Sequence, residues 1–516
     1  MDILTAAEMR EADRRTIQEV GVPGRVLMES AGRGVAGAME EHIEALDAKS
    51  IVIVCGKGNN GGDGLVLLRC LAALDYHVRG IVVGRFEDLP PDALGNLQSA
   101  LKLDLPVDSV TTEDEWRRAV EELWSAQVIV DAVFGTGLTR AAEGLPRRVI
   151  DDINALEATR VAIDLPSGLS ADSGRVIGAA VNADLTVALG AAKVCHFVPP
   201  ACEHCGALEI VEIGIPPQHL QCQGPVLSTI EPETLFGSWP ARTASTHKSA
   251  LGHLLIVAGS VGKTGAALMA AQAALRAGVG LVTIASAASA IPTMAPALPE
   301  AMWEPLPETA DGSIALDAAP RLAELITQRS ALALGPGLGL HDDTVRLVRK
   351  LMQETRVPTV IDADGLNALR GDTELITPLR AIALTPHPGE AARLLGVSSA
   401  DVQDDRLSAV RELASRVNNH VLLKGFRSLI ADPDGNTMVN LTGNPGLATA
   451  GTGDVLTGIV GALLAQGSTV AHALAVGVYV HGLAGDLAAK KLGETSLIAT
   501  DVIRALPEAV QSLGAD

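Results

Sequence analysis

The sequence contains few aromatic residues: only 2% of the chain, with five Phe, four Trp and two Tyr. This scarcity excludes proteins that bind single-stranded nucleic acid by stacking bases on aromatic rings. Basic residues are also in deficit, since 40 Lys and Arg stand against 61 Asp and Glu, for a net charge of −21. We therefore expect neither a nucleic acid nor a membrane as partner. Any phosphate ligand must be bound locally, by backbone N–H groups and a few lysines.

Cysteine is scarce as well, with six residues in 516. This is too few for a disulfide scaffold, and all of them lie before residue 223, which indicates two unlike halves. The segment Met1–Glu8 carries acids where a signal peptide needs basic and then apolar residues. The uncharged stretch 277–299 is broken by prolines, so it is a poor membrane helix. We expect a reduced, cytoplasmic protein.

Short apolar strands alternate with helical segments along most of the chain. Such alternation predicts an α/β fold with parallel sheets covered by helices on both faces, and ligands beyond the carboxyl ends of the strands. Residues 223–245 are rich in Pro and Gly, and we read them as a connector between a domain at 1–222 and a second at 246–516. The first helix is signalled by a capping box, Thr5-Ala6-Ala7-Glu8.

A glycine-rich segment, Lys57–Gly64, directly follows the predicted strand Ile51–Cys55. Glycines let the chain turn sharply and bring N–H groups against a ligand, and a following helix, predicted from Gly64, adds its positive end. The alternative is a tight turn with capping residues. The complete segment, with two asparagines and an aspartate among its glycines, favours a phosphate site.

Polar residues also end two further predicted strands, at Asp131–Gly137 and at Asp164–Gly168. Each segment alone would be an ordinary capped strand end. Together they converge on one edge of a parallel sheet, where oxygens of Asn60, Asp131 and Ser167 are of the type that surrounds a hard cation such as K⁺.

These segments, NNGGDG, DAVFGTG and DLPSG, resemble in this order the NAD(P)H-hydrate epimerase domain, over residues 1–222. The resemblance implies a Rossmann-like three-layer α/β/α domain that interconverts the R and S forms of hydrated NADH and NADPH (NADHX and NADPHX). It implies a K⁺ ion bound by Asn60, Asp131 and Ser167, with Asp164 nearest the reacting ring as the acid/base group. The implied substrate-binding residues are Asn59, Asn60, Gly61, Gly62, Asp63, Gly135, Thr136, Gly137, Leu138, Thr139, Arg140, Ala141 and Asp164. The reacting carbon is a hemiaminal, so a positioned proton-shuttling carboxylate contributes about 10²–10⁴ in rate.

Three cysteines and a histidine form a possible metal motif, Cys195-His196 with Cys202 and Cys205. A zinc site is one reading. No second CxxC or HxxxH follows, so we favour reduced cysteines.

In the second half, the segment Gly259–Ala266 is similar to a P-loop, the phosphate-binding loop of many nucleotide-binding proteins. A P-loop needs four residues between its first glycine and Gly-Lys-Thr, and here there are two, so we reject that reading. The stronger motif is Asn444–Leu456, which contains Gly451-Thr452-Gly453-Asp454 and leads into an apolar helix predicted from near Asp454. Its consecutive N–H groups can bind a phosphoryl group in transfer, and Asp454 can take the proton of an attacking hydroxyl. The alternative is an aspartate cap after a glycine turn.

Other glycine-bearing strand ends accompany this motif: Gly335–Gly339, Thr385–Glu390 and Lys424-Gly425. The GTGD motif resembles the ribokinase-like superfamily, and residues 227–514 resemble the ADP-dependent NAD(P)H-hydrate dehydratases of that superfamily. The resemblance implies that ADP, with Mg²⁺, phosphorylates the ring hydroxyl, and that elimination then restores NAD(P)H and leaves AMP and phosphate. The implied contacts to the hydrated dinucleotide are Ala266, Gly337, His387 and Asp454. The implied contacts to the nucleotide are Lys424, Gly425, Phe426, Arg427, Ser428, Gly451, Thr452 and Gly453.

The pairing of these two resemblances is itself typical of bifunctional repair enzymes for hydrated dinucleotides. Two alternatives stay open: a vitamin or sugar kinase fused to a Rossmann-like domain, and a first half that only binds ligand. The sequence leaves open ADP against ATP and NADHX against NADPHX, and we expect a homo-oligomer, with a tetramer as one form.

Overall fold

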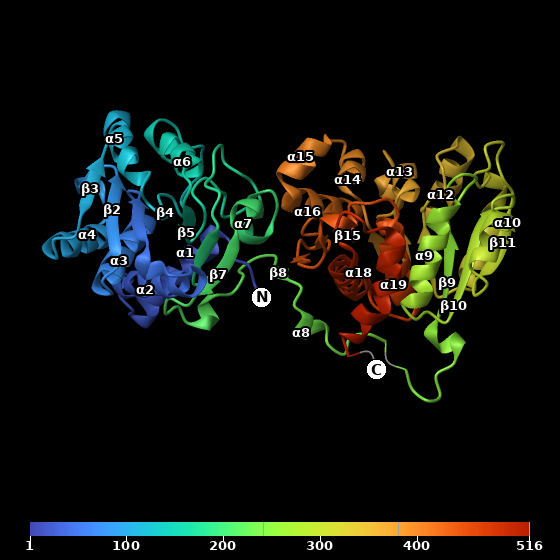
Figure 1. The fold of residues 1–516 in the computed structure, drawn as a ribbon. Coiled ribbons are helices and arrows are strands. Elements are labelled where there is room, and N and C mark those ends of the chain that lie inside the picture. The colour runs from blue at the N-terminus through green and yellow to red at the C-terminus, as the bar shows by residue number, and fades with distance from the viewer. Residues whose placement is uncertain (241, 380, 515–516) are drawn as a thin grey trace. The chain divides into compact units, whose positions relative to one another are not determined.

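The computed structural model describes residues 1–240, 242–379 and 381–514. The chain divides into two compact units (Figure 1): an N-terminal unit, Asp2–Val226, and a C-terminal unit, Leu227–Asp516 together with Met1. Residue 241 of the predicted connector and residues 380, 515 and 516 of the predicted second domain lie outside the described residues.

The N-terminal unit is a sheet covered by helices. Its strands are β1 (Ser50–Cys55), β2 (His77–Val83), β3 (Val107–Val110), β4 (Val128–Ala132), β5 (Thr159–Ile163), β6 (Leu185–Leu189) and β7 (Ala207–Val211). Its helices are α1 (Ala6–Arg15), α2 (Gly24–His42), α3 (Asn59–Ala73), α4 (Pro91–Lys102), α5 (Glu113–Leu123), α6 (Leu145–Ala155) and α7 (Val194–Phe197).

All seven strands of this sheet are parallel, in the order β3-β2-β1-β4-β5-β6-β7. This is the doubly wound, Rossmann-like arrangement that the sequence predicts, with its switch point between β1 and β4. Alternate residues of β1 enter two cores: Ile51 and Ile53 pack with residues of α2, α3 and α4, and Val52 and Val54 pack with residues of α5 and α6. Burial on both faces explains why β1 is a continuous apolar run.

The C-terminal unit contains a larger sheet. Its strands are β8 (Leu227–Thr229), β9 (His253–Val257), β10 (Leu281–Ala287), β11 (Met302–Leu306), β12 (Ala331–Leu334), β13 (Thr359–Ile361), β14 (Ile382–Leu384), β15 (His420–Leu423), β16 (Leu429–Ala431) and β17 (Thr437–Val439). Its helices are α8 (Pro232–Leu235), α9 (Thr264–Arg276), α10 (Ile291–Met294), α11 (Ala319–Thr327), α12 (Asp342–Glu354), α13 (Asp364–Ala368), α14 (Pro388–Leu395), α15 (Ser399–Asp404), α16 (Arg406–Val417), α17 (Thr452–Ala465), α18 (Val470–Leu492) and α19 (Ala499–Gln511).

The strand order is β11-β10-β9-β12-β13-β14-β15-β16-β17-β8. The strands from β11 to β15 are parallel, β16 is antiparallel to both of its neighbours, and β8 pairs in parallel with β17. Residues 227–229, which the sequence assigns to the connector, therefore belong to this sheet.

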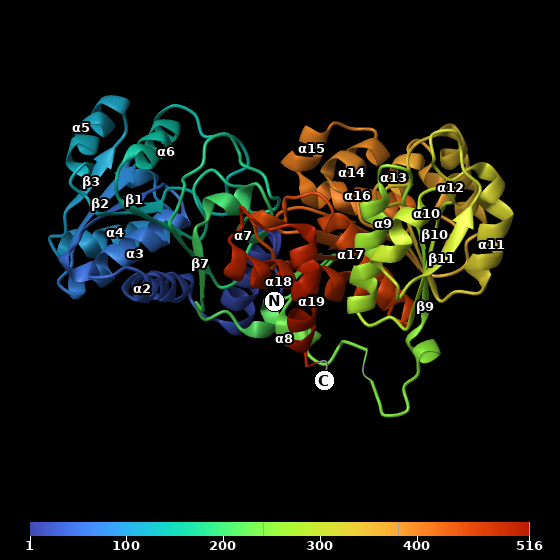
Figure 2. The same cartoon turned by 45° about the vertical axis from the view of Figure 1, so that its right-hand side comes forward.

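Helices α9, α17, α18 and α19 pack together in the C-terminal unit (Figure 2). The contact between α17 and α9 is close, because a Cβ at Gly458 would lie 2.1 Å from the carbonyl oxygen of Ala270. Helix α18 is, within the described residues, the single helix long and apolar enough to cross a membrane, but 72% of its apolar window is buried inside the unit. That burial is what a helix in a protein core shows.

Candidate active sites of the two units

The N-terminal unit contains a cavity of about 800 Å³ beyond the carboxyl ends of β1, β4 and β5. It lies at the switch point of the sheet, where ligands of such folds bind. The sequence-predicted residues in its lining are Asn59, Asn60, Asp63, Gly135, Thr136, Gly137, Leu138 and Asp164. Gly61 and Gly62 are buried in α3, and Thr139, Arg140 and Ala141 continue the turn beyond the lining.

The glycine-rich segment is not a loop followed by a helix from Gly64, as the sequence predicts. Helix α3 begins at Asn59, so most of the segment forms its first turns. The missing side chain of Gly61 allows this, because a Cβ there would lie 2.0 Å from the carbonyl oxygen of Gly56. The amino end of α3, with its unpaired N–H groups and positive dipole, therefore borders the cavity.

Of the residues predicted to bind K⁺, Asn60 lines this cavity, and Asp131 and Ser167 are buried. Buried Asp131 accepts hydrogen bonds from the backbone N–H of Val133 at 3.1 Å and from the N–H and hydroxyl of Ser167 at 2.7 and 2.6 Å. Burial raises the pKa of Asp131 to about 6, and the hydrogen bonds oppose that rise.

The side-chain amide of Asn60 is buried and has no hydrogen-bond partner among the described residues. Asn60 adjoins the turn that carries Ser167's partner, because a Cβ at Gly135 would lie 3.3 Å from Cγ of Asn60 and the N–H of Phe134 donates to the Ser167 hydroxyl at 2.8 Å. An unsatisfied amide oxygen beside such a turn is an arrangement that a bound cation would complete.

Asp164 is anchored by two residues that the sequence did not assign to this site. The ammonium group of buried Lys193 forms an ion pair with its carboxylate and also donates to the carbonyl oxygen of Leu189 at 2.7 Å. The Nε2 atom of buried His196 lies 2.9 Å from the backbone carbonyl oxygen of Asp164. The backbone of Asp164 is in the left-handed region, with a φ of 68°. The amide of Lys193 donates to Nδ1 of His196 at 3.0 Å, so the ring is neutral with its proton on Nε2. Burial lowers the pKa of His196 to about 4, which agrees with this form.

Two more carboxyl groups line the cavity, those of Asp13 on α1 and Asp63 on α3. Burial raises the pKa of Asp13 to about 6 and that of Asp63 well above its usual value. In both cases the charge of Asp164 adds to the rise and that of Lys193 opposes it. We call Asp13, Asp63, Asp164 and Lys193 the carboxyl–lysine cluster.

The cysteines of the possible zinc motif are not among the residues that line the cavity. Cys195 and Cys205 are buried, and the Cys205 thiol lies 3.7 Å from the carbonyl oxygen of Cys195. No group of three or more His, Cys, Asp or Glu suited to a metal ion occurs within the described residues. His196, which the zinc reading would use as a ligand, instead holds the backbone of Asp164.

In the C-terminal unit, the GTGD motif forms the amino end of α17. The helix begins at Thr452, two residues before the predicted start, with Gly451 as its cap at a φ of 95°. The unpaired N–H groups of its first turn are those of Thr452, Gly453 and Asp454, whereas the N–H of Val455 donates to the carbonyl oxygen of Gly451 at 3.1 Å. The Thr452 hydroxyl is not free for a ligand, since it donates to the carbonyl oxygens of Leu447 and Thr449 at 3.0 and 3.1 Å.

Asp454 lies among charged residues at this helix end. Burial raises its pKa to about 7, the carboxylates of Asp362, Asp364 and Glu390 add to the rise, and the Lys424 ammonium opposes it. A carboxyl group poised near neutral pH suits general acid–base chemistry.

Lys424 is fixed by Asp362, a residue that the sequence did not assign. Its Nζ lies 2.5 Å from Oδ1 of Asp362 and 4.0 Å from Oε2 of Glu390. The other carboxylate oxygen of buried Asp362 accepts from the hydroxyl of Thr457 on α17 at 2.6 Å. A Cβ at Gly453 would lie 3.4 Å from Nζ of Lys424, so the lysine is next to the amino end of α17.

The other predicted residues of this unit fall into two groups. Gly337 lies beside Ala266, because a Cβ at Gly337 would be 3.1 Å from that of Ala266. His387 caps α14, where its Nδ1 accepts from the N–H of Gly389 at 3.0 Å and its Nε2 lies 3.4 Å from Glu390. Burial and nearby Lys424 lower the pKa of His387.

The predicted nucleotide segment, residues 424–428, follows β15 as a strained turn. Gly425 and Arg427 have φ values of 138° and 53°. The exposed ring of Phe426 lies 5.5 Å from the guanidinium carbon of Arg427, and the hydroxyl of Ser428 donates to the carbonyl oxygen of Gly425 at 2.9 Å. Phe426 thus offers an exposed apolar face of the kind on which an adenine ring stacks.

The residues that sequence reasoning missed had weak local signals. Asp362 directly follows the apolar strand β13, which is the pattern that singled out Asp131 and Asp164. Lys193 is a lone lysine among small and apolar residues after β6, and Asp13 sits in a helix rich in arginine. Their roles depend on contacts between distant segments.

Comparison with known proteins covers both units. A family model described as YjeF-related protein N-terminus matches residues 24–195, and one described as NAD(P)H-hydrate dehydratase matches residues 254–508. A bifunctional NAD(P)H-hydrate repair enzyme Nnr from Moorella thermoacetica is 43% identical over 520 residues, covering 99% of this chain and 97% of its own.

The chain belongs to the family of bifunctional NAD(P)H-hydrate repair enzymes.

Other members of this family are also similar along their whole length. The repair enzyme of Thermofilum pendens is 38% identical, covering 100% of this chain and 97% of its own. That of Escherichia coli K12 is 33% identical, with coverage of 98% and 93%. Among solved structures, an ADP/ATP-dependent NAD(P)H-hydrate dehydratase from Bacillus subtilis, co-crystallized with ATP and Mg²⁺, is 32% identical, covers 57% of this chain and 100% of its own, and has a TM-score of 0.49.

Proposed function

We propose that this chain repairs hydrated NADH and NADPH in two steps. The N-terminal unit interconverts the R and S hydrates, and the C-terminal unit dehydrates the S hydrate with ADP to give NAD(P)H, AMP and phosphate. Similarity to named repair enzymes over 99% of the chain carries this proposal, because it joins both units in one relative. The alternative of a vitamin or sugar kinase has no such support.

In the dehydration step, Asp454 would take the proton of the ring hydroxyl as that hydroxyl attacks the terminal phosphorus of ADP. The N–H groups at the amino end of α17 and the nearby Lys424 would stabilise the phosphoryl group in transfer. Phosphate then leaves from the ring carbon, a proton is lost from the neighbouring carbon, and the double bond of the dihydronicotinamide is restored. Ala266, Gly337 and His387 would contact the dinucleotide, and residues 424–428 the adenine nucleotide.

Mg²⁺ fits this site. The site gathers the carboxyl groups of Asp362, Asp364, Glu390 and Asp454, and the first three raise the pKa of the fourth. Uncompensated, they would repel the phosphates of ADP, and oxygen ligands of this kind are those that Mg²⁺ prefers. When bound, the ion supplies charge neutralisation for the phosphoryl group. Asp364 and Glu390 are the residues we assign to it, which leaves Asp454 to accept the proton.

A coupled assay tests the whole proposal. Purified protein with S-NADHX, Mg²⁺ and either ADP or ATP should restore the absorbance of the dihydronicotinamide, and R-NADHX should be consumed through the same route. If the absorbance is restored from S-NADHX but R-NADHX is not consumed, the N-terminal unit is a binding module without epimerase activity. No recovery, with phosphoryl transfer to a vitamin or sugar alcohol, would favour the kinase alternative.

The dehydration rate should depend on pH through Asp454. A general base must be ionised, and its pKa of about 7 predicts that kcat/KM for the S hydrate falls as pH drops below that value. The measurement is kcat/KM at saturating Mg²⁺ and nucleotide across pH 5 to 9. A profile that stays flat between about pH 6 and pH 8 would contradict the role of Asp454.

For the epimerase site we propose a K⁺ ion bound by Asn60, Asp131 and Ser167, supported by the unpartnered amide of buried Asn60. Removing K⁺ by dialysis should slow R-to-S interconversion and lower the thermal midpoint of the N-terminal unit. A ligand at about 100 times its Kd stabilises the folded state by about 2.7 kcal/mol. Restoration by K⁺ but not by Na⁺ supports the site, and an unchanged midpoint with unchanged interconversion contradicts it.

We also propose that the chain is cytoplasmic and forms a homo-oligomer, with a tetramer as the form to test first. The six cysteines form no disulfide with one another within the described residues, which suits a reducing compartment. Light scattering on the purified full chain measures the oligomeric state, and a monomer at micromolar concentration would contradict it.

A further inference from the structure

Helix α1 presents one face to the cavity of the N-terminal unit. Met9 and Asp13 of α1 line the cavity together with Ile17 of the helical turn Thr16–Val20 that continues it, and their spacing of four residues places them along one side. The helix is anchored next to Lys193: the capping box of Thr5 and Glu8 fixes its start, and the N–H of Leu4 donates to the carbonyl oxygen of Ala192 at 2.9 Å. Asp13 is therefore a carboxyl group on an anchored wall of the cavity, in line with Met9 and Ile17 and flanked by Arg10 and Arg14.

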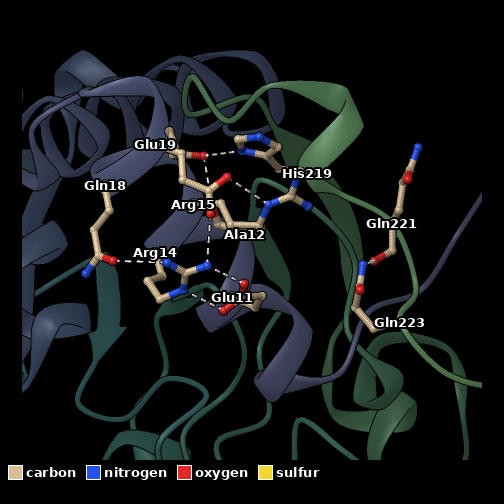
Figure 3. Close-up of polar contacts among 10 residues, drawn as sticks. Glu11, Ala12, Arg14, Arg15, Gln18, Glu19, His219, Gln221 and Gln223 are labelled. Carbon is tan, nitrogen blue, oxygen red and sulfur yellow. Dashed lines mark hydrogen bonds and ion pairs between the residues drawn. The ribbon is translucent and has the colours of Figure 1, made fainter.

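The arginines of α1 do not neutralise Asp13. The guanidinium group of Arg14 is occupied by Glu11, Gln18 and Glu19, and Nε of Arg15 lies 3.4 Å from Glu19 (Figure 3). Asp13 itself forms no side-chain hydrogen bond or ion pair within residues 1–240, 242–379 and 381–514. Its electrostatic neighbours are Lys193 and Asp164. An unpartnered carboxyl group that faces a ligand cavity is free to exchange a proton with the ligand.

The three carboxyl groups of the carboxyl–lysine cluster have different environments. Asp164 forms an ion pair with the Lys193 ammonium. Burial raises the pKa of both Asp13 and Asp63, and no cation pairs with either of them among the described residues. Carboxyl groups in unlike environments within one cavity are the arrangement by which enzymes with two carboxyl groups divide the acid and base roles.

The proposed epimerisation needs both. The hydroxyl leaves a hemiaminal carbon when an acid protonates it, the C–O bond breaks, and the ring nitrogen donates its lone pair to form a C=N bond. Water then adds to the opposite face, a new C–O bond forms, and a base takes the proton that the water loses. One carboxylate can serve as the base in the second half of this exchange, but the first half needs a separate acid.

We propose that Asp13 is the second catalytic group of the epimerase site, which protonates the departing hydroxyl while Asp164 accepts the proton of the incoming water. This rests on the proposed epimerase function. One proton leaves Asp13 and one reaches Asp164, so the count for enzyme plus substrate is unchanged. The resulting state, with the protonation of the two groups exchanged, is the one that converts the S hydrate back to the R hydrate.

The variant Asp13→Asn in the full chain tests this. It keeps the size of the side chain and removes the exchangeable acid, so kcat for R-to-S interconversion should fall about a hundredfold while KM changes little. Dehydration of the S hydrate should be unchanged. Glu11→Gln, on the same helix and in the ion pairs of Figure 3, is the matched control and should keep the wild-type rate.

Two further measurements distinguish catalysis from a structural role. The wild-type rate should follow a bell-shaped pH profile, and Asp13→Asn should lose the limb in which the rate falls at high pH. The charged and titratable groups around Asp13 are Arg10 and Arg14 on its own helix, Asp63 on α3, Asp164, Lys193, and His219 on the short helix Pro217–His219 that packs against α1. In H₂¹⁸O, interconversion should place the label in the ring hydroxyl.

The outcomes are distinct. Interconversion by Asp13→Asn within about twofold of wild type, a rise in KM with unchanged kcat, or interconversion without ¹⁸O uptake would each overturn the proposal. If Asp13→Asn does not fold, Asp13→Ser and Asp13→Glu are compared instead. Only Asp13→Glu keeps an acid, so it should retain R-to-S interconversion and Asp13→Ser should lose it. Wild-type protein that does not interconvert the epimers would instead refute the proposed function, without bearing on S dehydration.

Discussion

Replacing Asp454 with asparagine is expected to lower the rate of ADP-dependent S-hydrate dehydration by about 10²–10⁴. The amide keeps the shape of the carboxyl group but cannot accept the hydroxyl proton, while the N–H groups at the amino end of α17 remain in place. The measurement is kcat for restoration of dihydronicotinamide absorbance at saturating ADP and Mg²⁺.

R-to-S interconversion by the same sample is the control, and it should keep its wild-type rate, because Asp454 belongs to the C-terminal unit. Binding of the nucleotide should also persist, since its contacts do not need the Asp454 proton. Near-normal dehydration by this variant would remove Asp454 from the mechanism.

The variant Asp164→Asn should produce the opposite pattern, with R-to-S interconversion down by about 10²–10⁴ and S dehydration retained. Asparagine is the suitable replacement, because it tolerates the left-handed φ of 68° at this position and its oxygen can still accept from Lys193. The measurement is the rate of interconversion followed by chromatographic separation of the two epimers.

Asp164→Ala serves as a comparison, since it would leave the buried Lys193 ammonium without a partner and destabilise the N-terminal unit as well. A thermal unfolding curve of each variant separates loss of chemistry from loss of fold. Loss of both activities in a folded Asp164→Asn protein would indicate a wrong assignment of activities to the two units.

The order of elements and the strand-end motifs could be predicted from the sequence because they are local. An apolar run such as Ile51–Cys55 followed by glycines reports a buried strand and the turn after it, and the observed β1 differs by one residue at its start. The start of α3 could not be predicted, because it depends on the packing of Gly61 against the backbone of Gly56. Glycine has a low helix propensity, and tertiary contact outweighs it here.

The contacts that the site residues make with one another could not be predicted either, because they join segments far apart in the sequence. Asp131 and Ser167, 36 residues apart, are joined by hydrogen bonds, and both were found because each ends a strand. Lys424 and Asp362 lie 62 residues apart, and nothing in either segment points to the other. Asp13 is more distant still from Asp164, and contacts between distant segments, such as the pairing of Leu4 with Lys193 and the hydrogen bond from the N–H of Ala6 to Asp172, bring α1 to the cavity.

The neutral imidazole of His196 has a consequence for how the N-terminal site responds to acidity. Its pKa of about 4 lies below that of Asp13, at about 6. As the medium becomes more acidic, the carboxyl group of Asp13 changes state while the ring that holds the Asp164 backbone does not. The number of protons bound by the carboxyl groups of the cavity can thus change with pH near neutrality, while the His196 ring that positions Asp164 stays neutral.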